Sequence, residues 1–198
     1  DAISLHYYTM PSTFEDKLSA TDFDEDTYYA TMSAAWRIEE LLTRHGNIMD
    51  VYDPSKRIGL VLDEWGTWVE VEPGTNPGFL YQQNTMRDAL VASVHFDSFH
   101  RHADRLVMAN IAQTVNVLQA VLLTDGDTLI KTPTYHVFEM NRAHHDADSL
   151  AVAWIGEPVP TRQVGRTALP LVSGSASVKD GVVLVSLSNL DLDEARTV

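Results

Sequence analysis

The sequence predicts an α/β region with a parallel sheet, followed by an all-β region. Up to about residue 121, short apolar runs alternate with helix-period stretches, a pattern typical of βαβ units. Beyond that point no helix-period stretch follows, and Asp180-Gly181 lies between two β-rich runs, which is a strong hairpin signal. A boundary between residues 124 and 134 therefore separates the two regions.

The run at residues 58–62 is the central strand of the predicted sheet. It is apolar and has turn-prone residues on both sides, which indicates a strand buried on both faces. Asp63 and Glu64 follow it directly, beside Trp65 and Trp68. In barrels and open α/β sheets, active sites lie at the carboxyl ends of the strands. An acid there with indole rings that can stack on a sugar favours a glycosidase nucleophile, and capping of the next loop is the alternative.

Residues 3–8 alternate in the manner of a strand, with His6 and Tyr8 on the same face. At the carboxyl end of a strand, two such side chains can converge on one point. A hydrogen-bonded pair in the core is the alternative interpretation. The loop that follows, residues 10–20, is of the long kind that carries function.

Two long helices are predicted. Asp22 and Glu25 resemble a capping box, which would begin a helix that ends near Val51. Its apolar stripe includes His45, which is expected to pack or to be hydrogen-bonded; the other members are Ile38, Leu41, Leu42, Ile48 and Met49. The second helix is expected over about residues 79–100, after a loop rich in Pro and Gly.

The remaining expected strands include residues 106–111 and 134–140. Asn110, Gln113 and Asn116 lie at or just beyond the end of the first of these strands. Neutral amides at a strand end suit recognition of hydroxyl groups, and polar capping is an equal explanation.

Composition restricts the kind of partner. The formal charge is −14, which argues against nucleic acid and against an acidic polysaccharide, so a neutral polysaccharide is favoured. No apolar run approaches the roughly 18 residues of a membrane span, so no membrane partner is predicted. Cysteine is absent, which excludes disulfides and thiolate metal sites and fits a cytoplasmic protein.

No metal site is predicted either. His95, His100 and His102 lack the i, i+4 spacing with which two histidines ligate one metal from a helix face. The sequence His144-His145-Asp146 has the composition of an ordinary polar loop.

Several ordered motifs make the sequence resemble a known family, the α-L-arabinofuranosidases of glycoside hydrolase family 51. These motifs are residues 5–8 (LHYY), 63–68 (DEWGTW), 72–90, 102–117 and 132–138. The resemblance is strong over about residues 1–140. Beyond them it depends only on the general strand-rich character of the sequence. The family fold is a (β/α)8 TIM barrel followed by a jelly-roll-type β-sandwich. The resemblance implies that residues 1–130 are the last three β/α units of the catalytic barrel and that residues 131–198 are a partial C-terminal sandwich.

The resemblance also implies an activity and a site. Family members are retaining, exo-acting enzymes with two carboxylates, and the nucleophile position maps onto Glu64. His6 matches an active-site histidine, Tyr8 a tyrosine that hydrogen-bonds the nucleophile, Gln113 a glutamine that contacts the arabinosyl hydroxyls, and Trp68 an aromatic residue on the leaving-group side. The family's acid/base glutamate, in an Asn-Glu pair after the fourth strand, has no counterpart in this chain.

Strand alternation predicts that the neighbouring carboxylate, Asp63, turns away from Glu64 and is structural. The expected substrates are arabinan, arabinoxylan or their oligosaccharides, no cofactor is implied, and a homo-oligomer is expected by resemblance. The sequence leaves two alternatives, which are a barrel glycosidase acting on a different pentoside and a non-catalytic carbohydrate-binding or scaffold protein.

Overall fold

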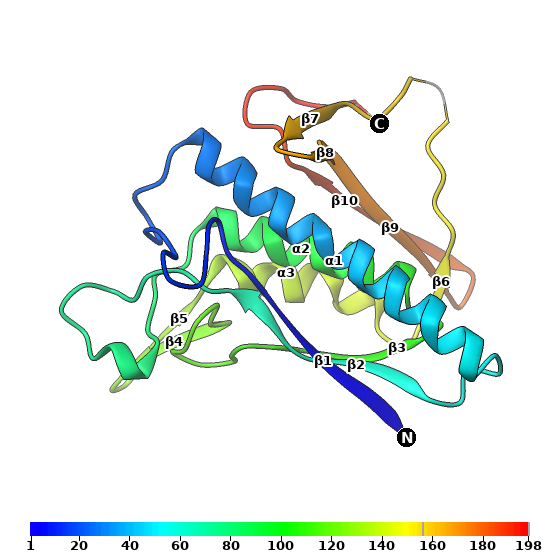
Figure 1. Cartoon of the computed structure of the whole chain (residues 1–198), viewed down its shortest axis with the longest axis horizontal. Coiled ribbons are helices and arrows are strands. Elements are labelled where there is room, and N and C mark those ends of the chain that lie inside the picture. The colour runs from blue at the N-terminus through cyan, green and yellow to red at the C-terminus, as the bar shows by residue number, and fades with distance from the viewer. Residues whose placement is uncertain (156, 198) are drawn as a thin grey trace.

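The computed structural model describes residues 1–155 and 157–197, in which three helices lie between a parallel and an antiparallel sheet (Figure 1). In chain order the helices and strands are β1 (Ala2–Thr9), α1 (Glu25–Tyr52), β2 (Gly59–Thr67), a 3-10 turn η1 (Pro77–Phe79), α2 (Met86–Arg101), β3 (Leu106–Ile111), β4 (Leu122–Asp125), β5 (Thr128–Lys131), α3 (Pro133–Asn141), η2 (Arg142–His144), β6 (Asp148–Leu150), β7 (Thr161–Val164), β8 (Thr167–Pro170), β9 (Val172–Lys179) and β10 (Val182–Asn189). No helix within these described residues is long and apolar enough to cross a membrane.

The parallel sheet has the strand order β1-β2-β3, as expected for consecutive βαβ units. The bounds predicted for its third strand, residues 106–111, are confirmed. The second strand is longer than predicted, because it continues past Leu62 to Thr67. Trp65, Gly66 and Thr67 are buried and pair with β1, so the ladder does not stop at the end of the apolar run.

The helices cover one face of this sheet and form the main core with it (Figure 1). Leu60, Leu62 and Trp65 of β2 contribute side chains that are fully or almost fully buried. The buried partners from the rest of the chain are Ile38, Leu42, Met49, Ala89, Ala92, Phe99, Leu106 and Val137. The carboxyl ends of the strands are therefore held against a helix layer, and no helix of the described residues covers the opposite face of the sheet (Figure 1).

The start and the apolar stripe of α1 differ from prediction. The helix is capped by Asp24, whose carboxylate accepts a hydrogen bond from the Thr27 N–H at 2.9 Å, so the capping box at Asp22 is wrong. His45 is exposed, and Ile48 is 58% exposed. Ile38, Leu42 and Met49 of the predicted stripe are buried and Leu41 packs against the same core, so the error is confined to His45 and Ile48.

The second helix, α2, starts at Met86 and not near residue 79. A capping box fixes this start, because Thr85 and Asp88 exchange side-chain and backbone hydrogen bonds. Before it, the side chain of Gln82 accepts from the Val69 N–H and donates to the Thr67 carbonyl. These two bonds tie the preceding segment to β2 and keep it out of the helix.

Residues 134–140 form most of helix α3, so the strand predicted there is wrong. Pro133 occupies the first turn, where backbone N–H groups have no partner within the helix, so the lack of an N–H costs no hydrogen bond. Phe138 stacks parallel to Trp65, with ring centroids 6.2 Å apart, and meets Phe96 edge to face at 4.9 Å. The aromatic and β-branched residues of this segment suit a strand as well as a helix. Packing of Phe138 against Phe96 of α2 stabilises the helix.

The antiparallel sheet has the order β10-β9-β6 and contains the predicted hairpin. Asp180 and Gly181 both have positive φ angles, 52° and 78°, as a two-residue type I′ turn requires. Polar contacts join this sheet to α2, where the Asp97 carboxylate accepts hydrogen bonds from Ser175 and Ser188 at 3.0 and 3.2 Å. This antiparallel region is consistent with a β-sandwich domain.

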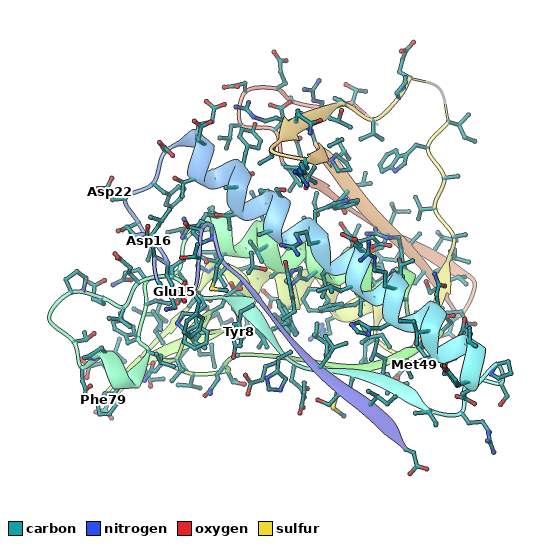
Figure 2. The ribbon with its side chains drawn as sticks, viewed as in Figure 1. Tyr8, Glu15, Asp16, Asp22, Met49 and Phe79 are labelled. Carbon is teal, nitrogen blue, oxygen red and sulfur yellow. The ribbon has the colours of Figure 1, made fainter. Side chains whose placement is uncertain are left out.

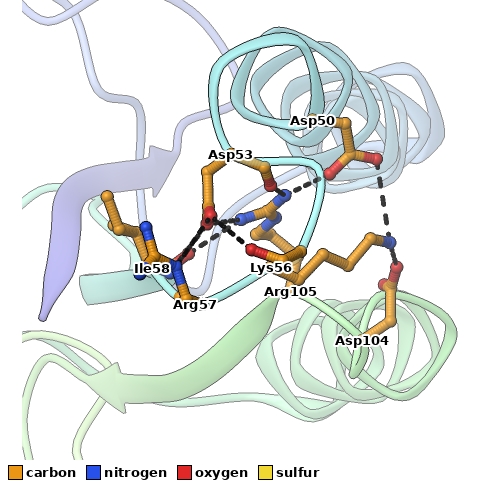
Figure 3. Close-up of polar contacts among 8 residues, drawn as sticks. Asp50, Asp53, Lys56, Arg57, Ile58, Asp104 and Arg105 are labelled. Atoms are coloured by element: carbon orange, nitrogen blue, oxygen red, sulfur yellow. Dashed lines mark hydrogen bonds and ion pairs between the residues drawn. The ribbon is translucent and has the colours of Figure 1, made fainter.

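A charged network fixes the other end of the parallel sheet (Figure 3). Arg105, which is almost fully buried, donates to the carboxylate and the carbonyl of Asp53, at 2.9 Å each, and to the Asp50 carboxylate. Asp53 also accepts from the Ile58 N–H at 2.8 Å, and Lys56 pairs with Asp104. The end of α1 and the starts of β2 and β3 are thereby held together, at the end of the strands opposite Asp63 and Glu64.

Candidate active site

An extra residue in β2 shapes the region around Asp63 and Glu64. Leu62 pairs with Leu5, but the next pair along β1 is His6 with Glu64, so one residue of β2 has no partner on β1. The pairing of β2 with β3 shifts across the same segment. A bulge of this kind bends a strand and re-aims its side chains.

Both carboxylates consequently lie on the face of the sheet away from the helices. The His6 imidazole is 3.4 Å from Glu64 through Nδ1 and 4.0 Å from Asp63 through Nε2. The prediction that alternation turns Asp63 away is therefore wrong, because the bulge interrupts the alternation. Asp63 accepts hydrogen bonds from the Ser4 hydroxyl and the Asn110 amide, both at 3.3 Å.

Tyr8 makes the shortest of the described contacts to Glu64. Its hydroxyl donates a hydrogen bond to Oε2 at 2.6 Å, and the geometry is that of a charge-assisted bond. Burial, followed by the hydrogen bond to Glu64, raises the pKa of Tyr8 above its ordinary value. Tyr8 therefore stays protonated near neutral pH and remains a donor to the carboxylate. It lies near the carboxyl end of β1, as predicted (Figure 2).

Trp68 follows β2 and extends the site outward. Its ring meets the Tyr8 ring edge to face at 5.0 Å, and the backbone N–H of Trp68 donates to the Thr9 carbonyl at 3.0 Å. Phe14, from the loop between β1 and α1, also packs on Trp68, edge to face with ring centroids 5.3 Å apart. Sequence patterns gave no signal for Phe14, because an irregular loop has no periodicity.

Gln113 lies just beyond the carboxyl end of β3, on the side of the sheet end where a cavity of about 880 Å³ opens. Phe79, Tyr81, Asn116 and Ile130 also line this cavity. The structure thus brings His6 and Tyr8 to Glu64 and places Trp68 against Tyr8, whereas Gln113 lines a cavity that does not include Glu64.

Buried polar contacts support the end of β2 behind the site. The Thr67 N–H donates to the Gln119 side chain at 2.7 Å, and its hydroxyl donates to Asp88 at 2.5 Å. His95 lies in the core beside Thr9 and Trp65, and burial lowers its pKa to about 3. A neutral His95 and the bonds of Thr67 keep this end of the sheet rigid beneath the exposed carboxylates.

The site is open on the side away from the helices, where the side chains of His6 and Glu64 are 51% and 45% exposed. Across residues 1–155 and 157–197, no three His, Cys, Asp or Glu side chains cluster closely enough to hold a metal ion. The arrangement presents an oriented carboxylate beside a hydroxyl, an imidazole and aromatic rings.

An oriented carboxylate on a parallel β/α sheet, with a phenol, an imidazole and aromatic rings beside it, is the kind of site that glycoside hydrolases use. The sequence matches the family described as "Alpha-L-arabinofuranosidase C-terminal domain" over residues 63–196. It is 52% identical to the intracellular exo-α-L-arabinofuranosidase of Bacteroides ovatus over the full length of this chain and 38% of that protein.

Two solved structures of α-L-arabinofuranosidases are also similar to this chain. The GH51 arabinofuranosidase of Xanthomonas axonopodis pv. citri matches with a TM-score of 0.91 and 52% identity, over 96% of this chain and 38% of that one. The α-L-arabinofuranosidase of Thermotoga maritima in its arabinose complex, at 23% identity, shares the fold with a TM-score of 0.72, over 96% and 38% of the two chains. The chain therefore belongs to the α-L-arabinofuranosidases of glycoside hydrolase family 51, and it spans about 38% of the length of these relatives.

Proposed function

We propose that this chain is part of a retaining, exo-acting α-L-arabinofuranosidase and that Glu64 is the nucleophile. The observation that carries the proposal is the hydrogen bond from Tyr8 to Glu64 at 2.6 Å, beside His6, on the open face of a parallel sheet in a member of this family. A carboxylate held by a phenol in this way has a fixed direction of attack, as a nucleophile requires.

The reaction would proceed by two displacements. Glu64 attacks the anomeric carbon of a terminal arabinofuranosyl unit and forms an ester, while the bond to the leaving oxygen breaks. A second carboxylic acid, from the part of the enzyme outside these 198 residues, gives its proton to that oxygen. The same group then takes a proton from water, which attacks the ester, releases arabinose and restores Glu64. Tyr8 and His6 keep the Glu64 carboxylate in place throughout.

The architecture belongs to the same proposal. Residues 1–130 would be the last three β/α units of a (β/α)8 barrel, and residues 131–198 part of a C-terminal β-sandwich. The parallel order β1-β2-β3, the antiparallel sheet and the 38% share of the relatives' length support this division. Helix α3 lies beyond the proposed boundary but packs on α2, so it would cover the barrel from the second region.

The substrate would be a neutral arabinan, an arabinoxylan or one of their oligosaccharides, cut at terminal α-L-arabinofuranosyl units. A formal charge of −14 supports a neutral glycan over an acidic one. The relative from Bacteroides ovatus is named an intracellular exo-enzyme, which supports exo-action inside the cell for this protein as well. Self-association into a homo-oligomer is expected from family membership.

The test compares the two neighbouring carboxylates in the intact enzyme. With 4-nitrophenyl α-L-arabinofuranoside, Glu64→Ala should abolish release of 4-nitrophenol, and added azide should restore part of it by attacking the anomeric carbon from the vacated side. Asp63→Ala is the matched control, because it removes a carboxylate from the same face and the same imidazole. Azide should not accelerate this second variant.

Two results would contradict the proposal. Normal turnover by Glu64→Ala would remove this residue from the nucleophile role. Azide rescue of Asp63→Ala, without rescue of Glu64→Ala, would transfer the role to the neighbour.

A further inference from the structure

We propose that Phe14 binds the second sugar unit on the leaving-group side of the scissile bond, one unit beyond the position at Trp68. This inference rests on the proposed function, because it assigns a substrate preference to the same site. The consequence is a preference for longer arabinose-bearing chains over the shortest substrates.

The side chains form a row that leads away from the nucleophile. Glu64 accepts from Tyr8, Tyr8 meets Trp68 at 5.0 Å, and Trp68 meets Phe14 at 5.3 Å. The Tyr8–Trp68 and Trp68–Phe14 centroid separations are each comparable to the length of one sugar unit. If the arabinosyl unit is bound at Glu64 beside Tyr8, the next sugar unit reaches Trp68 and the following one reaches Phe14.

Phe14 is exposed and yet held in place. Its side chain is 55% exposed, which is unusual for so large an apolar group. The Lys17 ammonium lies over its ring, 4.1 Å from the centroid, and also donates to the Phe14 carbonyl. Thr13 and Asp16 bond to one another across the same turn. An exposed ring that is already fixed loses little conformational freedom when a ligand stacks on it.

The surroundings suit a neutral sugar. Glu15, Lys17, Trp68 and Glu70 line a cavity of about 390 Å³, and two of them, Trp68 and Lys17, also contact the Phe14 ring. Two carboxylates and one ammonium leave this hollow with a net negative charge, which disfavours a sugar acid. Carboxylate oxygens accept hydrogen bonds from sugar hydroxyls, and the rings supply apolar faces. Figure 2 shows Glu15 and Asp16 of this loop at the Tyr8 end of the sheet, away from Met49 near the far end of α1.

The experiment compares an arabinofuranosyl disaccharide with the corresponding trisaccharide in the intact enzyme. The disaccharide fills only the first leaving-group position, whereas the trisaccharide reaches Phe14. Phe14→Ala should lower the ratio of kcat/KM for trisaccharide over disaccharide by about three- to tenfold, the range that one aromatic contact contributes. Phe14→Trp should keep the ratio high, because it keeps an aromatic face.

Tyr52→Ala is the matched control, since Tyr52 is an 85% exposed aromatic residue at the last position of α1. It should leave both substrates unaffected. An unchanged ratio in Phe14→Ala, or an equal loss for both substrates, would overturn the inference while the wild-type turnover still supports the proposed function. Failure of the wild-type enzyme to cleave either substrate would instead refute the proposed function, and this inference with it.

Discussion

Replacing Tyr8 with Phe isolates the contact on which the proposed nucleophile depends. The variant keeps the ring that packs on Trp68 and removes only the hydroxyl that donates to Glu64 at 2.6 Å. Hydrogen bonds to charged groups contribute about 1.5–3 kcal/mol. Because the Glu64 side chain is 45% exposed, solvent screens part of this energy and the lower half of the range applies. The lower half is about 1.5–2.25 kcal/mol, so the expected loss in kcat is about 13- to 45-fold.

The assay is steady-state hydrolysis of 4-nitrophenyl α-L-arabinofuranoside by the intact enzyme, with kcat and KM measured separately. Tyr7→Phe is the matched control from the adjacent position in the strand. The Tyr7 hydroxyl donates to the Ala34 carbonyl on the helix-covered side of the sheet, so its removal should leave kcat unchanged. The comparison separates an effect on the nucleophile from a general loss of a strand hydrogen bond.

A kcat for Tyr8→Phe within about twofold of the wild-type value would refute the reasoning, because an energy below about 0.4 kcal/mol would leave the contact without a catalytic role. Equal losses in Tyr7→Phe and Tyr8→Phe would refute it too, since the effect would then come from the strand as a whole.

Two further predictions concern stability. Trp65→Ala should lower the free energy of unfolding by about 3–5 kcal/mol, because it empties a fully buried site beside four aromatic rings; chemical denaturation followed by far-UV circular dichroism measures this, and a loss under about 1 kcal/mol would contradict it. Burial lowers the pKa of His95 to about 3 from an ordinary value near 6.5, so the folded state should lose stability as the pH falls through this window. Melting temperatures at pH 7 and pH 5 test this prediction, and a His95→Leu variant should show a smaller difference between the two.

The features that could be predicted from the sequence depend on local patterns. Period-2 alternation placed His6 and Tyr8 on one face of β1, and both reach Glu64. The apolar run 106–111 became β3 with the predicted bounds, and Asp180-Gly181 became the turn of the β9–β10 hairpin. In each case neighbouring residues alone determine the structure, through side-chain direction or a turn that requires positive φ.

The features that were missed depend on tertiary contacts. Helix α3 is stabilised by the contacts of Phe138 with Trp65 and Phe96, which are distant in sequence. The orientation of Phe14 is determined by Trp68, more than fifty positions later. His45 shares the stripe of Ile38, Leu42 and Met49 but is exposed, because periodicity does not show which members of a stripe meet a packing partner.

The bulge at Asp63 explains how one strand can serve both the core and the site. Leu62 and Trp65 are both fully buried under the helices, although they are three positions apart. Regular alternation would place Leu62 and Glu64 on the same face, with Trp65 opposite. The carboxylate would then be buried without a cation, and the indole would be exposed, and both arrangements are unfavourable. One extra residue restores Trp65 to the core and turns Asp63 and Glu64 together toward His6. The position of the proposed nucleophile is therefore a consequence of how Trp65 packs.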